Sequence, residues 1–427
     1  MKIAILGAGN VGATLGRGLA AAGHRIAYAV RAPGDPKHDV SRSHAEVLAV
    51  PDAVREADAV ILATPWAAAE AALASAGDLG GRPLLDATNP IGPGFTLTHG
   101  GDDSGGEQVA RWAPSARVVK VFNTTGKENM ADPRYGAARA AMFVAGDDEA
   151  ARALALGLAR DLGFEAASVG GLSRARVLEP LAMLWIRLAM GLGHGRDVAL
   201  GLLRREGVAE APAAAPSEGP PLSVAILGSG RIGAGLGRAW ARAGHDVVFG
   251  VRDETDPETR ALATALGARL ASVRAAPEGA DVVALAVPHR ALDEVLAEAG
   301  ELAGRVVIDC TNAVGPGFSL VHAHTTSAAE ELARRLPRAH VVKSFNAQGA
   351  ENLAAPVYDG VPAVNFFCGD DAAAKDAVRR LVRDIGFAPI DAGPLASARL
   401  LEPLMVVWVL AAQALGTRDL GFVLLRR

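Results

Sequence analysis

Two tandem α/β domains, each a doubly wound parallel sheet covered by helices, are the fold that the sequence predicts. The first observation behind this prediction is that the 427-residue chain repeats itself over the length of a whole domain. The second is that short Val, Ile, Leu and Ala runs alternate with helical patterns in each repeat, as a parallel sheet buried on both faces requires. The third is a Pro- and Ala-rich stretch between the repeats.

The repeat is visible in motifs that recur at a nearly constant spacing. Gly7-Ala8-Gly9-Asn10-Val11-Gly12 returns as Gly228-Ser229-Gly230-Arg231-Ile232-Gly233, at an offset of 221 (228 − 7). From Asp58 and Asp281 onward the offset is 223 (281 − 58), so the second copy has two extra residues after its second strand. The unit is a domain of about 200 residues, far longer than a solenoid repeat.

The domain boundaries follow from composition. We predict a first domain at 1–205, a linker at 206–221 and a second domain at 222–427, because the prolines and small residues of the linker neither continue a helix nor join a sheet. Each domain closes with a small helical region containing a long apolar segment, Ser173 to Leu203 or Ala396 to Leu425. Such segments need a partner surface. We expect the two copies to supply it to each other as an intramolecular pseudo-dimer.

Individual elements are predicted from local patterns. In the first copy we expect strands at 2–6, 25–30, 59–63, 83–86 and 117–122, and helices at 10–22 and 66–76. Later helices are expected at 149–161 and 372–384, with strands near Ala166 and Pro389. Ser104 with Glu107, and Ser327 with Glu330, fit capping boxes ahead of short helices.

Composition excludes several classes of function. The net charge is −4, from 43 basic and 47 acidic residues without a basic run, so neither nucleic acid nor an anionic membrane is an expected partner. The only cysteines, Cys310 and Cys368, have neither disulfide-framework nor zinc spacing, and we expect no metal. The longest apolar run, Leu404 to Ala412, is shorter than the 18 or so residues of a membrane span. A soluble, cytoplasmic protein acting on a small molecule is expected.

The glycine motifs predict dinucleotide binding by two Rossmann-like domains, because each follows an apolar strand and opens a helix. Gly7 and Gly228 would form the tight turn, Gly9 and Gly230 would let the backbone approach the pyrophosphate, and Gly12 and Gly233 would allow close helix packing. The intervening Asn10, Val11, Ser229, Arg231 and Ile232 are included in the predicted cofactor site.

The residue after the second strand indicates which nucleotide binds. Arg31 and Arg252 stand where an NAD site usually has a carboxylate for the ribose 2′-hydroxyl. A guanidinium suits a 2′-phosphate in charge and geometry, so NADP is the predicted cofactor. The alternative is an ordinary surface arginine at a strand end.

Polar groups at two further strand ends are candidates for the reaction site. Thr64 and Pro65, matched by Val287 and Pro288, are predicted to contact the cofactor, because they follow a strand at the carboxyl edge of the sheet. The next positions differ: Trp66 could stack on a ring and His289 could donate a proton, although both also suit an ordinary helix start. The predicted catalytic residues comprise this histidine and the polar groups of a later strand end: Lys120, Asn123, His289, Lys343 and Asn346.

Alternatives for these residues stay open. The lysines could each pair with a carboxylate, and Glu179 and Glu402 could cap a helix or pair with Arg176 and Arg399. No Tyr-x-x-x-Lys pair, metal cluster or nucleophile triad is present in the sequence. That pattern favours hydride transfer between two redox rings, which depends on alignment and water exclusion more than on a dedicated proton donor.

Both copies resemble the NADP-dependent oxidoreductases that reduce coenzyme F-420. The resemblance rests on the glycine motif, the arginine after the second strand, Asp-Ala-Thr-Asn-Pro, Lys-Val-Phe-Asn-Thr, Ala-Gly-Asp-Asp and Gly-Gly-Leu-Ser-x-Ala-Arg-x-Leu-Glu. Each copy is also similar to the nucleotide-binding domains of the six-transmembrane metalloreductases, which pass hydride from NADPH to a flavin. The chain differs in having Val30 and Val251 where relatives often carry serine or threonine.

The resemblance implies a Rossmann domain with a small helical region, usually paired as a homodimer, with NADP on the glycine loop and the acceptor ring over the nicotinamide. It assigns the 2′-phosphate to Arg31 and Arg252, and the nicotinamide-proximal backbone to Pro65, Pro288, Asn123 and Asn346. The predicted function is hydride transfer between NADP(H) and a deazaflavin (coenzyme F-420) or flavin. The alternatives are an NADPH-dependent reductase of a small carbonyl or imine, and a non-catalytic NADP-binding scaffold or sensor.

Overall fold

The computed structural model describes residues 1–34, 45–205 and 219–427. The chain divides into two compact units: Met1–Leu202 with Gln413–Leu415 and Leu424–Arg427, and Leu203–Ala412 with Gly416–Val423. Most of the predicted linker, residues 206–218, lies outside the described residues. The boundaries 1–205, 206–221 and 222–427, and the intramolecular pseudo-dimer, stay predictions.

The first unit is built on an eight-stranded sheet in the order β12-β11-β8-β5-β4-β1-β2-β3. The chain winds outward from β1 in both directions, which leaves a switch point between β1 and β4. The strands are β1 (Lys2–Leu6), β2 (Arg25–Val30), β3 (Glu46–Ala49), β4 (Ala59–Leu62), β5 (Pro83–Asp86), β8 (Arg117–Lys120), β11 (Ala141–Gly146) and β12 (Glu165–Gly170). Two short antiparallel hairpins, β6 (Ile91–Gly92) with β7 (Thr96–Leu97) and β9 (Arg134–Tyr135) with β10 (Ala138–Arg139), lie outside this sheet.

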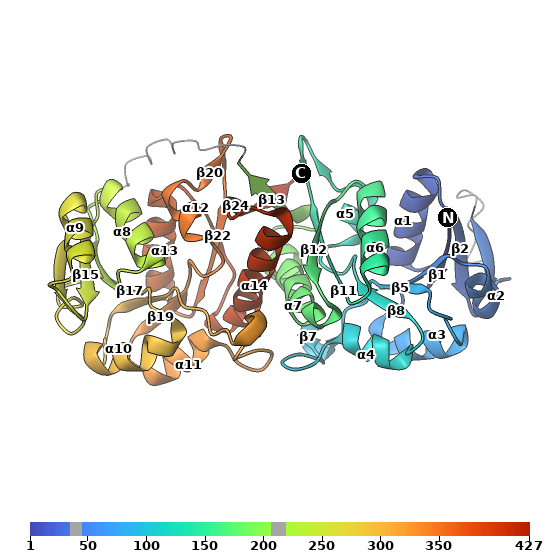
Figure 1. The fold of residues 1–427 in the computed structure, drawn as a ribbon, viewed down its shortest axis with the longest axis horizontal. Helices are drawn as coiled ribbons and strands as arrows, with labels where there is room; N and C mark the ends of the chain where they lie inside the picture. Colours follow the sequence, from blue (N-terminus) through green and yellow to red (C-terminus); the bar gives the residue numbers. More distant parts are fainter. Residues whose placement is uncertain (35–44, 206–218) are drawn as a thin grey trace. The chain divides into compact units, whose positions relative to one another are not determined.

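Alternate residues of each central strand enter two different cores. Ile3 and Ile5 of β1 pack on one face, while Ala4 and Leu6 pack on the other. The apolar runs are therefore continuous because both faces are buried. The helices that cover the sheet are α1 (Asn10–Ala21), α2 (Val50–Arg55), α3 (Ala69–Ala76), α4 (Gly105–Trp112), α5 (Lys127–Ala131) and α6 (Glu149–Asp161), and Figure 1 shows α1 and α6 on one side and α3 and α4 on the other.

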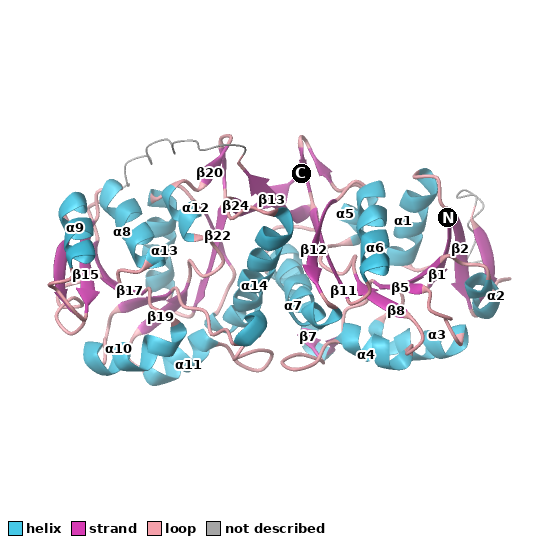
Figure 2. Ribbon diagram, viewed as in Figure 1, coloured by secondary structure: helices cyan, strands magenta, loops and turns pink. Residues whose placement is uncertain are grey.

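The second unit repeats this architecture, with strand order β16-β15-β14-β17-β18-β19-β22-β23 (Figure 2). Its strands are β14 (Ser223–Leu227), β15 (Asp246–Val251), β16 (Arg269–Ser272), β17 (Val282–Leu285), β18 (Val306–Asp309), β19 (His340–Lys343), β22 (Val364–Gly369) and β23 (Ala388–Asp391), with the small hairpin β20 (Val357–Tyr358) and β21 (Val361–Pro362). Its helices are α8 (Arg231–Arg242), α9 (Pro257–Leu266), α10 (Leu292–Ala299), α11 (Ala328–Arg335), α12 (Ala350–Ala354) and α13 (Ala372–Asp384). The stretch with two extra residues contains α9. The predicted α/β class with two Rossmann-like sheets is confirmed.

One pairing in each described sheet is antiparallel, so that β11 with β12, and β22 with β23, run against the other strands. β11 pairs antiparallel with β8, and β22 pairs antiparallel with β19. Only a very short helix and a hairpin separate β8 from β11, so the chain turns back at the same sheet edge without a crossover. The expectation of a wholly parallel sheet did not include this turn.

The capping boxes are confirmed as N-caps. Ser104 Oγ accepts a hydrogen bond from Glu107 N (3.1 Å), and Ser327 Oγ accepts one from Glu330 N (3.2 Å). Both glutamates also accept the serine hydroxyl (2.6 and 2.7 Å). These caps begin α4 and α11, which contribute to the sites described below.

Each copy ends in a buried helix and a strand. These are α7 (Ala175–Ile186) and β13 (Val198–Arg204) in the first copy, and α14 (Ala398–Leu415) and β24 (Leu420–Arg426) in the second. The predicted apolar segments thus contain a strand as well as a helix. Among the described residues, one helical segment, Leu395–Leu415, is long and apolar enough to cross a membrane, and 72% of its most apolar window is buried within the structure.

Candidate functional site

The first and third glycines of each motif are required by the backbone itself. Gly7 has φ +105° and Gly228 has φ +108°, a conformation that L side chains rarely adopt. A Cβ on Gly12 would lie 1.9 Å from the Gly7 carbonyl oxygen, and one on Gly233 would lie 2.0 Å from that of Gly228. These glycines therefore set the tight turn and the close approach of helix to strand.

The middle glycine of each motif faces open space instead. A Cβ built on Gly9 or Gly230 meets no atom of the described chain within 4 Å. Both residues are N-caps without a side-chain cap, so the first N–H groups of α1 and α8 lack that partner. Open space in front of free helix N–H groups suits a pyrophosphate. The residues present thus fit a dinucleotide at both turns.

The residues between the glycines differ between the copies. Asn10 and Val11 begin α1 in the first copy. In the second, Ser229 Oγ lies 3.1 Å from Thr259 Oγ1 of α9, and Arg231 of α8 forms an ion pair with Glu351 of α12. Ile232 follows in the first turn of α8 and packs against the core.

The two arginines after the second strand lie at the surface. Arg31 is exposed. Arg252 is also exposed, with its Nη1 3.8 Å from Glu294 Oε2 of α10. Both guanidiniums remain accessible to an anion, and their assignment to the 2′-phosphate stays a prediction.

The end of β4 lies beside the glycine turn, because β4 pairs with β1 along its whole length. Thr64 Oγ1 is buried and has no hydrogen-bond partner among the described residues. In the second copy the matching residue is Val287, which lies close to Gly228. Pro65 and Pro288 follow and are exposed. A ligand at this edge could satisfy the Thr64 hydroxyl, whereas Val287 offers only apolar contact.

Aromatic rings gather after β4 in the first copy. The Trp66 ring centroid lies 5.3 Å from that of His99, in an edge-on arrangement, and 5.0 Å from that of Trp112 of α4. The His99 Nδ1 lies 3.0 Å from Thr98 Oγ1. These side chains form an indole-rich rim, hereafter the first rim.

The second copy carries a pair of imidazoles at the same place. His289 replaces Trp66, and its ring centroid lies 6.0 Å from that of His322, the counterpart of His99. His289 Nδ1 is buried without a hydrogen-bond partner among the described residues. Burial lowers the pKa of His289, and nearby His322 and Lys343 act in the same direction against Asp309 and Glu402. His289 and His322 are hereafter the second rim.

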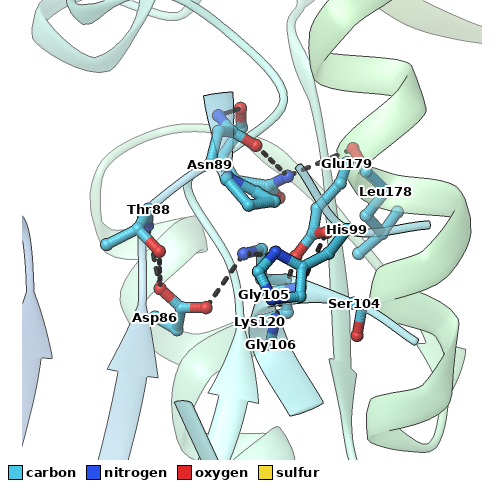
Figure 3. Close-up of polar contacts among 12 residues, drawn as sticks. Asp86, Thr88, Asn89, His99, Ser104, Gly105, Gly106, Lys120, Leu178 and Glu179 are labelled. Atoms are coloured by element: carbon cyan, nitrogen blue, oxygen red, sulfur yellow. Dashed lines mark hydrogen bonds and ion pairs between the residues drawn. The ribbon is translucent and has the colours of Figure 1, made fainter. Parts of the chain in front are cut away.

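A buried ion triad lies at the carboxyl ends of β5 and β8 in the first copy (Figure 3). Lys120 Nζ lies 2.9 Å from Asp86 Oδ2 and 2.8 Å from Glu179 Oε1, and all three side chains are at most 1% exposed. Burial alone would lower the pKa of Lys120, but the two carboxylates outweigh it and raise that pKa. Lys120 is therefore held as an ammonium.

The triad ties four elements together. Glu179, from α7, accepts hydrogen bonds from Gly105 N and Gly106 N at the start of α4, both at 3.0 Å. These N–H groups and the helix dipole offset the second negative charge. Burial raises the pKa of Glu179, and Lys120 opposes that shift.

The second copy has the same triad. Lys343 Nζ lies 2.9 Å from Asp309 Oδ2 and 3.1 Å from Glu402 Oε1, and the carboxylates raise the Lys343 pKa against the effect of burial. Glu402 accepts hydrogen bonds from Ala328 N and Ala329 N (3.1 and 3.2 Å). The alternative in which each lysine pairs with carboxylates is thus the observed arrangement, and a catalytic role for the lysines stays a prediction.

Asn123 and Asn346 are fixed beside the triads. Asn123 Nδ2 donates to Asn89 Oδ1 and to the Leu178 carbonyl (both 3.1 Å), and Asn346 makes the matching bonds to Asn312 and Leu401. The preceding residues, Phe122 and Phe345, have φ of +63° and +56°. Strain of this kind in a bulky residue is found at functional sites. Asn123 Oδ1 is buried without a partner among the described residues.

Similarity to known proteins shows the family to which the chain belongs. A family model described as NADP oxidoreductase, coenzyme F-420-dependent, matches residues 2–90 and again 223–313. The F-420-dependent NADP reductase of Methanothermobacter marburgensis is 32% identical over 211 residues, covering 44% of this chain and 92% of the reductase. The chain belongs to this family. The resemblance predicted from the motifs is confirmed, including its occurrence in two copies.

Two other relatives extend the comparison. Metalloreductase STEAP3 of Rattus norvegicus is 35% identical over 189 residues, which make up 44% of this chain but only 37% of the relative. The chain thus matches little more than a third of the length of that protein. A solved structure from Arthrobacter sp. fb24, provisionally assigned as an F-420-dependent NADP reductase, is 36% identical, with TM-score 0.43, covering 46% of this chain and 96% of that one.

The chain is thus a member of a family of NADP-dependent oxidoreductases. The family match ends at residues 90 and 313, before Lys120 and Lys343. The glycine turns, the strand ends after β4 and β17, and the aspartates of the triads therefore lie within the matched segments.

Sequence reasoning missed several residues of the site. The aspartates of the triads entered the prediction only through the Asp-Ala-Thr-Asn-Pro motif, and His99, Trp112 and His322 were not among the predicted site residues. Of the two alternatives for Glu179 and Glu402, the structure has the helix cap, whereas Arg176 and Arg399 pair with Glu107 and Glu330. The signal was the repeated Asp-x-Thr-Asn motif, which places a carboxylate at a strand end in both copies.

Proposed function

We propose that the chain transfers hydride between NADP(H), bound at a glycine turn, and the planar ring of a deazaflavin or flavin. The observation that carries the proposal is the combination, at one sheet edge, of an open glycine turn, an indole-rich rim and a lysine that two carboxylates keep charged. Such a site offers flat apolar surface and fixed geometry, which ring-to-ring hydride transfer needs.

Each part of the first copy has a role in this proposal. Gly9 and the first N–H groups of α1 hold the pyrophosphate, and Arg31 binds the 2′-phosphate. Trp66 and Trp112 provide a face for the acceptor ring and exclude water from it. When bound, NADPH supplies the hydride, and solvent supplies the proton that accompanies it.

The ion triad acts as the floor of the site. Lys120, Asp86 and Glu179 fix β5, β8, α4 and α7 relative to one another, and Asn123 is anchored to the same helix through Leu178. We therefore propose that Lys120 positions the strand end and does not transfer a proton. An ammonium held by two carboxylates in a buried site is a poor acid.

The test is anaerobic NADPH oxidation by the purified chain with coenzyme F-420, with FMN and without acceptor. We expect oxidation only when a planar acceptor is present. A matched control is the Gly9→Asp, Gly230→Asp double variant, in which carboxylates occupy the open space at both turns. NADPH binding without turnover of either acceptor would contradict the proposal and favour a sensor.

A second candidate function, reduction of a small carbonyl or imine, is favoured at the second copy by the second rim. His289 can give a proton to the oxygen or nitrogen while hydride from the bound nicotinamide reaches the carbon, so that the reduced cofactor, a proton and C=X yield the oxidised cofactor and HC–XH. A panel of ketones and cyclic imines tests this in Gly9→Asp, which leaves only the second turn open. Turnover that His289→Gln abolishes supports it, and equal turnover in both proteins contradicts it.

The proposal includes a cytoplasmic location. Cys310 and Cys368 are buried free thiols, as is usual in a reducing compartment. Cell fractionation with an antibody to the chain tests this, and recovery in the membrane fraction would contradict it.

A further inference from the structure

The surroundings of the two strand-end arginines differ in charge. Arg252 lies 3.8 Å from Glu294 of α10. At the offset of 223, the counterpart of Glu294 in the first copy is Ala71 (294 − 223), which carries no charge. Part of the field of Arg252 is therefore already neutralised by Glu294, whereas the matching position of the first copy is uncharged.

The residues after the arginine sharpen this difference. Asp253 and Glu254 follow Arg252, whereas Ala32 and Pro33 follow Arg31. Asp253 Oδ1 accepts hydrogen bonds from Thr255 N and Thr255 Oγ1 (2.8 and 2.6 Å). These bonds lower the pKa of Asp253, so it is ionised at neutral pH.

The acidic segment is held next to the glycine turn. Asp256 caps α9 by accepting a hydrogen bond from Thr259 N (2.9 Å), and Thr259 Oγ1 lies 3.1 Å from Ser229 Oγ of the turn. In the first copy Ala8 replaces Ser229 and offers no hydroxyl. The Thr259–Ser229 contact fixes the start of α9 close to the nucleotide site.

These charges act in opposite ways on the two nucleotides. A phosphomonoester carries a charge of about −1.5 to −2 at neutral pH and is repelled by carboxylates. A ribose 2′-hydroxyl is neutral and donates a hydrogen bond to a carboxylate, as in NAD sites. Carboxylates beside the arginine thus disfavour NADP(H) and tolerate NAD(H).

We propose that the two copies select different nucleotides: the first takes NADP(H), and the second takes NAD(H), because Glu294 and Asp253 oppose a 2′-phosphate. This inference rests on the proposed function in that both glycine turns hold a dinucleotide. It changes the predicted role of Arg252 from a phosphate ligand to the partner of Glu294.

The experiment uses full-length variants in which one glycine turn is blocked. Gly230→Asp leaves the first copy to bind, and Gly9→Asp leaves the second; either new side chain enters open space, so the fold is retained. Calorimetric titration with NADPH and NADH gives two dissociation constants for each variant. We expect Gly230→Asp to prefer NADPH by about tenfold or more and Gly9→Asp to prefer NADH.

Substitutions at position 294 and at its counterpart, position 71, test whether this one charge sets the preference between the nucleotides. In the Gly9→Asp background, Glu294→Ala should tighten NADPH binding about tenfold and leave NADH binding within twofold. Glu298→Ala, which removes the same charge one turn further along α10, is the matched control. In the Gly230→Asp background, Ala71→Glu should weaken NADPH binding.

The outcomes separate the two proposals. Equal preference for NADPH in both blocked variants, or the same effect from Glu298→Ala as from Glu294→Ala, overturns nucleotide selection. If neither blocked variant binds NADPH or NADH, although circular dichroism shows that both proteins are folded, the proposed function itself is overturned.

Discussion

The two copies share a buried ion triad and differ in the side chains of the first and second rims. The triads match residue for residue, with Lys–Asp distances of 2.9 Å in both. The rim changes from Trp66 to His289, and Glu294, which lies near Arg252, has the uncharged Ala71 as its sequence counterpart. A buried charge cannot be altered alone without a large loss of stability, whereas an accessible side chain can. Divergence at the rim therefore indicates divergence in ligands.

The largest expected effect is the loss of stability when the lysine of a buried ion triad is replaced. Lys120→Met and Lys343→Met each leave two carboxylates buried without their cation, which should lower the free energy of unfolding by about 3–5 kcal/mol. Urea unfolding measures it. Arg111→Met, which removes an exposed ion pair with Asp103, is the control and should cost less than about 1 kcal/mol. Similar losses in all three variants would show that a buried triad contributes no more to the free energy of unfolding than an exposed ion pair.

The next effect concerns the rims and their pH dependence. In the Gly9→Asp background, His289→Trp should reduce carbonyl or imine reduction by about a hundredfold or more, since it removes the acid. Because protonated His289 is the donor, kcat/KM should fall as pH rises through its pKa, which burial lowers from the ordinary value of a histidine. Trp66→His in the Gly230→Asp background is the reciprocal variant. A pH profile unchanged by His289→Trp would contradict the assigned role.

A smaller effect separates the arginines. In the copy to which each belongs, Arg31→Ala should weaken NADPH binding about tenfold, while Arg252→Ala should weaken it less than threefold. The measurement is the NADPH dissociation constant in the blocked variants, and NADH serves as the control ligand. Equal losses would mean that both arginines bind a 2′-phosphate.

The smallest expected effect concerns the N-caps of α4 and α11, which the two copies have in common. Ser104→Ala and Ser327→Ala each remove an N-cap and should each lower the free energy of unfolding by about 1 kcal/mol. Thermal unfolding of both variants, with the exposed Ser75→Ala as control, gives the values. A loss in only one variant would show that α4 and α11 are not equivalent.

The sequence predicted what is encoded locally. The glycine turns, β1, β2, the central helices and both capping boxes follow from neighbouring residues, and all occur in the structure. The partners of Lys120 could not be predicted, because Asp86 and Glu179 lie 34 and 59 positions away along the chain (120 − 86, 179 − 120) and only the sheet order brings them together. The same holds for Trp66 with His99, and for the antiparallel β11, whose direction depends on the turn before it.

Isotope transfer tests the central claim most directly. NADPH carrying deuterium at C4 of the nicotinamide is incubated anaerobically with the protein and coenzyme F-420, and the reduced deazaflavin is analysed by mass spectrometry. Because the accepting carbon of a deazaflavin does not exchange its new hydrogen with water, direct hydride transfer predicts deuterium in the product from one face of NADPH. Reduced deazaflavin without deuterium from either face, or no reduction at all, would contradict the account.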